Sequence, residues 1–166
     1  MVSTVAATLV VLAIGAAVFV GSGVYNIGAD DHHTKPVLAV IEQLRNRSVA
    51  VRARAIAVPN LEDPRSIAAG AKQYATLCMG CHLAPGVTKS DVRPGLYPHP
   101  PNLAQEDIDD AQRTFWIIKH GIKMSAMPAW GKTLNDGAIW DIVSFVRQMP
   151  GMSPETYQQL SIAPSK

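Results

Sequence analysis

Residues 78–82 read Cys-Met-Gly-Cys-His, and this stretch decides what kind of domain the chain forms. In the pattern Cys-x-x-Cys-His, two thiols form thioether bonds to the vinyl groups of a haem, and the histidine is the proximal ligand of its iron. A zinc site would need a third and a fourth ligand at similar spacing, and the chain has no further cysteine. A redox dithiol would need a βαβ context, which is absent. The motif therefore predicts one covalently bound haem c, held by Cys78, Cys81 and His82.

The second half of the predicted site lies in residues 120–131, which read His-Gly-Ile-Lys-Met-Ser-Ala-Met-Pro-Ala-Trp-Gly. A thioether suits the sixth position of the iron, because soft sulfur favours the ferrous state. Met124 and Met127 both carry a thioether. We favour Met127 as the ligand, because Pro128 restricts the backbone next to it, and we interpret Met124 as core filler. His120 also carries a ligating nitrogen, but we interpret it as a surface residue at a helix end.

Around these motifs the chain resembles the class I cytochromes c, over roughly residues 63–149. Gly70, Tyr74 and Cys78 keep the four-residue spacing of the family's N-terminal helix. Residues 141–146 resemble the family's C-terminal helix. The resemblance implies that the glycine permits close approach of these two helices.

The segment Pro101-Asn102-Leu103 is similar to a Pro-Asn-Leu segment of the same family. The resemblance implies that the Pro101 carbonyl accepts a hydrogen bond from the second ring nitrogen of His82, which orients the imidazole and tunes its basicity. A proline-rich insert between His82 and Pro101 departs from the family pattern, and Pro94 within it is a rival for this role.

Capping signals predict three helices without reference to the family. Asp63 followed by proline begins the first helix. A second helix runs over residues 110–120 and closes at Gly121. Asn135 caps the third helix, which ends before Pro150. The apolar face of the first helix comprises Ile67, Ala71, Tyr74, Ala75 and Cys78. Because no stretch alternates apolar and polar residues over a strand length, we predict an all-α haem domain at residues 63–150, followed by a C-terminal tail at 151–166.

The first 29 residues predict a membrane anchor, since residues 2–29 carry no charged side chain. About 20 apolar residues span the hydrocarbon core of a bilayer. The alternative is a cleaved signal peptide, which has a positive N-terminal region, whereas no Lys or Arg precedes Lys35 here. We therefore expect a retained single-pass helix at 1–29 in a bacterial inner membrane. Haem attachment to this motif takes place outside the cytoplasm, so residues 30–166 are expected in the periplasm.

Residues 30–62 are predicted to form a helical periplasmic linker between anchor and haem domain. Its apolar positions are Leu38, Ile41, Leu44, Val49 and Ile56, and its basic cluster is Arg45, Arg47, Arg52 and Arg54. A segment that served only as a flexible tether would leave these apolar side chains exposed to solvent, which is unfavourable. We expect the segment to contact another membrane subunit. The alternatives are that it lies on anionic lipid or folds back on its own haem domain.

These features together predict a membrane-tethered one-electron carrier, not an enzyme acting alone, because a haem iron ligated by His82 and Met127 has no open position. The expected partners are redox proteins or subunits of a respiratory complex with an oxidase or reductase. Lys119, Lys123 and Lys132 flank the methionine loop and would steer acidic partners. The net charge of +2 does not indicate nucleic-acid binding. The alternatives are a haem sensor or peroxidase with a displaceable methionine, and an assembly or docking subunit.

Overall fold

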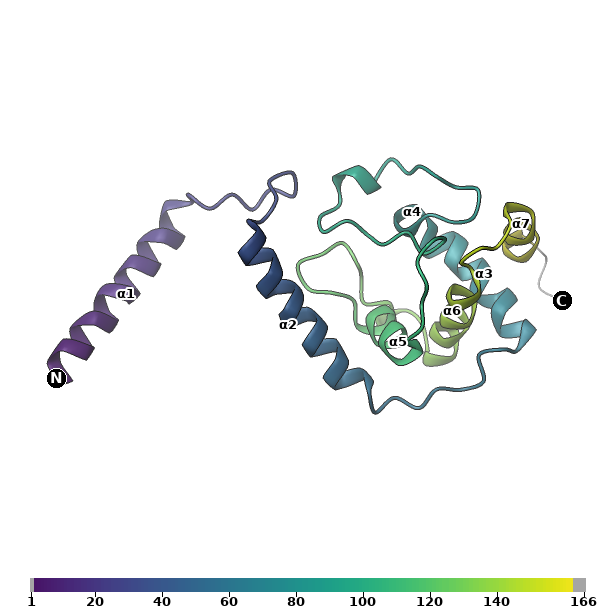
Figure 1. Ribbon diagram of the computed structural model, residues 1–166, viewed down its shortest axis with the longest axis horizontal. Helices are drawn as coiled ribbons and strands as arrows, with labels where there is room; N and C mark the ends of the chain where they lie inside the picture. The colour runs from purple at the N-terminus through teal and green to yellow at the C-terminus, as the bar shows by residue number, and fades with distance from the viewer. Residues whose placement is uncertain (1, 163–166) are drawn as a thin grey trace. The chain divides into compact units, whose positions relative to one another are not determined.

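The computed structural model describes residues 2–162 and divides into two compact units, Met1–His32 and His33–Lys166. Figure 1 shows helices joined by loops, and residues 2–162 contain no β-strand. The predicted all-α class is therefore confirmed.

The first unit holds one long helix, α1 (Val2–Ser22). Every described residue of α1 is exposed, although the helix is almost wholly apolar. By length and composition α1 can cross a membrane, since 21 residues match the thickness of a bilayer core.

The second unit is built around two helices that pack closely, α3 (Pro64–Leu77) and α6 (Asp136–Gln148). The helix α5 (Ala111–His120) packs on α6, and α7 (Pro154–Ile162) packs on α3. Three shorter elements also belong to the unit: α4 (Met79–His82), η1 (Arg93–Gly95) and η2 (Trp130–Lys132). The largest fully buried side chains of the core are Tyr74, Phe145, Ile139, Ile142 and Met149.

The predicted caps Asp63 and Asn135 begin α3 and α6, and Asp110 caps α5 in the same way. Asp63 accepts a hydrogen bond from the Arg65 amide, and Asp110 accepts one from the Arg113 amide. Asn135 caps α6 through the Ala138 amide. Each of these side chains satisfies a backbone donor that has no partner within its helix.

Gly70 lies at a close contact between α3 and α6. A Cβ atom at this position would lie 1.9 Å from the Asp141 carbonyl oxygen and 2.9 Å from Cβ of Phe145. Only glycine fits this contact, so the close approach that the family resemblance implies is present. The contact aligns the end of α3, where the Cys-x-x-Cys-His turn begins.

The structure changes the expected role of the linker. Helix α2 (Lys35–Ala53) belongs to the same compact unit as the haem domain and packs on α5. Val49 and Ala53 are buried in this contact. The segment thus folds back on its own domain, which was the alternative to the expected contact with another subunit. The segment packs in this way because the apolar side chains of Val49 and Ala53 lie one helical turn apart, on the face toward α5.

The C-terminal segment is more than a tail, because α7 packs on α3 and buries Tyr157. The Tyr157 ring lies 6.0 Å from the Phe145 ring, measured between centroids, and its hydroxyl lies 3.4 Å from the Met79 sulfur. The compact unit therefore extends beyond residue 150 and reaches the haem-binding motif.

Candidate haem site

The two cysteines lie on one helical turn at the end of α3. The amides of Cys81 and His82 both donate to the Cys78 carbonyl oxygen, at 3.0 and 2.9 Å. Cys78 is buried, Cys81 is half-buried, and both thiols are free. Burial, together with the neighbouring Cys81, raises the pKa of Cys78 to about 12. The turn presents two thiols and a histidine from closely spaced positions, which is the donor set that covalent haem attachment requires.

The imidazole of His82 is oriented by one hydrogen bond. Its Nδ1 lies 3.1 Å from the Pro101 carbonyl oxygen. A proton on Nδ1 satisfies that carbonyl and leaves Nε2 with a lone pair for a metal. Of the two prolines considered from the sequence, Pro101 makes this contact, whereas Pro94 lies exposed in η1.

Burial lowers the pKa of His82, and the nearby positive charge of Arg93 acts in the same direction. The Pro101 hydrogen bond and the charge of Glu106 oppose the shift. The net effect favours the neutral imidazole, which is the form that binds iron. The chain beyond the histidine is held as well, because the Leu103 amide donates to the His82 carbonyl oxygen at 3.2 Å.

The methionine loop folds back onto the end of α5. Gly121 ends that helix with a φ of +66°, and a Cβ there would lie 2.7 Å from the Met127 carbonyl oxygen. The same oxygen accepts a hydrogen bond from the Ile122 amide at 3.2 Å. The Ser125 hydroxyl donates to the Ile122 carbonyl and accepts from the Met127 amide. The backbone of Met127 is therefore held on both sides.

The two methionines of this loop occupy different environments. Met127 is half-buried and packs against the hydrophobic core, which also contains Cys78. Met124 is 87% exposed and has a φ of +58°, a left-handed conformation that side chains rarely adopt. Met124 is therefore not the core filler that the sequence predicts. His120 is exposed at the end of α5, with its ring 4.7 Å from that of Trp116.

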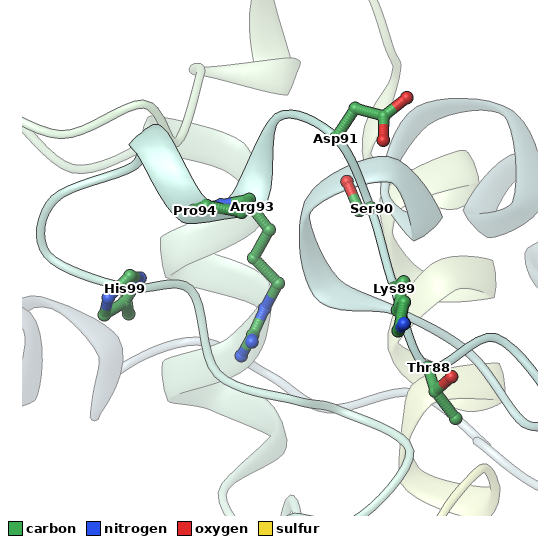
Figure 2. Close-up of a pocket in the computed structure, with 7 residues that line it drawn as sticks. All are labelled: Thr88, Lys89, Ser90, Asp91, Arg93, Pro94 and His99. Carbon is green, nitrogen blue, oxygen red and sulfur yellow. The ribbon is translucent and has the colours of Figure 1, made fainter.

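Arg93 is a residue of the site that sequence reasoning missed. It lines a pocket of about 460 Å³, and Figure 2 shows its side chain extending between His99 and Lys89. One guanidinium nitrogen donates to the Pro100 carbonyl oxygen at 2.7 Å, but the buried Nε has no hydrogen-bond partner among residues 2–162. Haem carries two propionate carboxylates, and an unpaired guanidinium donor near His82 fits such a group. Only the position of Arg93 before a proline in the insert sets it apart in the sequence.

The lysines around the methionine loop are not equivalent. Lys119 forms an ion pair with Asp136, with 2.7 Å between Nζ and the carboxylate oxygen. Lys123 and Lys132 are exposed. The positive charge available to an approaching partner therefore comes mainly from these two.

A comparison with known families agrees with this geometry. The model of the family described as "Cytochrome C oxidase, cbb3-type, subunit III" matches residues 65–146, which run from the start of α3 to near the end of α6. No solved structure matches the chain significantly. The matched region contains both cysteines, His82, Pro101 and Met127. Residues 65–146 therefore form a class I c-type cytochrome domain, which carries electrons on a covalently bound haem c.

Proposed function

We propose that the protein is a membrane-anchored one-electron carrier in which His82 and Met127 would bind the haem iron. The observation that carries this proposal is the contrast between the two methionines, of which Met127 packs on the core and Met124 is exposed to solvent. When bound, haem c supplies an iron that cycles between the ferric and ferrous states. A histidine and a methionine together leave no open coordination position, which favours electron transfer over substrate chemistry.

The residues of the chain have separate roles in this proposal. The Pro101 carbonyl orients the imidazole of His82 and increases its electron donation by accepting a hydrogen bond from Nδ1–H. Gly121 and Ser125 hold the loop that presents Met127. The guanidinium of Arg93 supplies a donor for a carboxylate at the edge of the site.

The setting of this electron transfer is a membrane surface. The support is the length and composition of α1, which can span a bilayer. Because the matching family is described as a subunit of a respiratory oxidase, we propose that the protein exchanges electrons with an oxidase or reductase of the bacterial inner membrane. The haem domain faces the periplasm.

Replacing the two methionines one at a time tests the ligand assignment. In Met127→Ala, we expect the weak red absorption band that methionine ligation gives to ferric haem to disappear, and the reduction potential to fall, because the thioether stabilises the ferrous state. Met124→Ala is the matched control and should keep both properties. Loss of the band in Met124→Ala with retention in Met127→Ala would overturn the assignment.

A further inference from the structure

The outer face of α2 carries a stripe of apolar side chains that no residue between 33 and 162 covers. Val40 and Leu44 are 68% and 70% exposed. The full stripe comprises Val37, Val40, Ile41, Leu44 and Val51, all exposed. With 3.6 residues per turn, these five positions fall within an arc of about 100°. Contiguous exposed apolar surface of this kind marks an interaction site.

The opposite face of α2 is fixed to the haem domain, so the stripe cannot turn inward. Val49 and Ala53 are buried at the contact with α5. Arg113 donates to the Asn46 side chain at 2.8 Å, and Gln112 donates to the Ile56 carbonyl oxygen at 2.5 Å. These contacts hold the inner face of α2 against the haem domain. The apolar stripe on the outer face takes no part in them, so its partner must lie outside the compact unit.

Positive charge borders the stripe on both sides. In the same helical projection, Arg45 and Arg52 lie along one edge, and Arg47 and Arg54 lie along the other. The one acidic residue of the helix, Glu42, lies toward the inner face and forms an ion pair with Arg45 at 3.8 Å. The outer face is thus apolar at its centre and cationic at both edges.

We propose that this stripe is a lipid-contact surface, on which α2 lies in the headgroup region of an anionic bilayer. Its apolar side chains would enter the acyl boundary while the arginines reach lipid phosphates. This inference rests on the proposed anchoring by α1. Residues 23–34 connect the two helices and span at most about 40 Å when fully extended, so α2 stays near the membrane into which α1 inserts.

The chemistry of the stripe favours lipid over a protein partner. The apolar arc holds aliphatic side chains and offers no hydrogen-bonding group for a specific partner beyond the Ser48 hydroxyl, which already accepts from Arg52 at 2.8 Å. Arginines along both edges match a plane of phosphates on either side of an inserted helix. Since the inner face of α2 is attached to α5, binding through the outer face would set the orientation of the haem domain at the membrane.

Single cysteines in the full-length haem protein test this proposal, because both native thiols are bonded to haem. Leu44→Cys places a thiol in the stripe, and Ala50→Cys places one at an exposed position of the same helix outside it. Each variant is reconstituted in vesicles of phosphatidylcholine with phosphatidylglycerol and treated with a charged, water-soluble maleimide. We expect the thiol at 44 to react several-fold more slowly than the thiol at 50. Replacing phosphatidylglycerol by phosphatidylcholine, or combining Arg47→Gln with Arg54→Gln, should reduce this difference.

Equal reaction rates at 44 and 50 in anionic vesicles would overturn the proposal. Equal rates in vesicles together with protection of position 44 in native membranes would also overturn it, and would assign the stripe to a protein subunit. Alkaline washing of the vesicles distinguishes this failure from failure of the anchor. Protein that stays in the pellet with a reactive thiol at 44 refutes the lipid contact alone, whereas protein released by washing refutes both the anchor and the contact.

Discussion

Tyr74 shows how a single residue connects the helical core to the haem-binding turn. Its ring is completely buried beside Phe145, with 5.4 Å between centroids, and its hydroxyl donates to the Leu83 carbonyl oxygen at 2.6 Å. Leu83 follows His82 and has a φ of +62°, in the left-handed region that non-glycine residues rarely adopt. The hydrogen bond therefore holds the backbone at the point where it leaves the turn.

We predict that Tyr74→Phe lowers the free energy of unfolding at neutral pH by about 1–3 kcal/mol, because it leaves a buried carbonyl without its donor. Burial raises the pKa of Tyr74 above its ordinary value. The stabilisation is therefore fully present below the unfolded-state pKa, about 10, and is lost as the pH rises above it. Urea unfolding of both haem proteins at neutral and alkaline pH measures this. The variant should lose less stability at alkaline pH than the unaltered protein, and equal losses would contradict the prediction.

The residues of the site differ in how far the sequence alone predicts them. Cys78, Cys81 and His82 are adjacent, so local spacing is enough to identify their chemistry. The contact between His82 and Pro101 joins residues 19 positions apart, and spacing alone could not decide between Pro101 and Pro94. Arg93 was missed because its unpaired Nε depends on the fold of the whole insert, which has no periodic pattern.

At the scale of helices, the contact between α3 and α6 determines whether the haem-binding turn is placed correctly. We predict that Gly70→Ala lowers the free energy of unfolding by about 3 kcal/mol or more, because the new Cβ would overlap the Asp141 backbone. Gly137→Ala is the matched control, since its Cβ would meet only the end of the Asn135 side chain at 3.3 Å. Denaturant unfolding followed by circular dichroism compares them. A similar small effect of both substitutions would show that α6 can move away from α3 at little cost.

The helices that were predicted and the helix that was missed differ in the source of their stability. Helices α3, α5 and α6 have side-chain caps and apolar faces that local sequence reveals. Helix α7 has one buried residue, Tyr157, and no apolar stripe. Its formation depends on packing against α3, and short helices depend on such tertiary contacts. Because the sequence does not show the packing against α3, it predicts only a C-terminal tail for these residues.

For the whole molecule, the compact unit that contains the haem domain begins well before residue 63, the start that the sequence suggests. The compact unit begins at His33, whose amide donates to the Tyr97 hydroxyl at 3.2 Å. Family spacing could not reveal this, because the resemblance starts near residue 63. The apolar pattern of α2 was recognised, but periodicity does not show which of two faces packs inward. Val49 is buried, whereas Leu44 is exposed.

This division of α2 into two faces leads to a prediction about the isolated haem protein in mild detergent. We expect the amides around Val49 and Ala53 to exchange slowly with solvent, because this part of the helix is attached to α5. Val49→Asp would bury an unpaired charge at this contact. It should speed exchange across residues 36–56 while leaving α3 and α6 protected. Leu44→Asp is the matched control, because the same substitution on the exposed face should leave protection of the segment unchanged.

Hydrogen exchange followed by mass spectrometry measures both variants. If residues 36–56 of the unaltered protein exchange rapidly in detergent and become protected only in a larger membrane assembly, the packing of α2 on its own domain is too weak to hold the segment, and another subunit must order it.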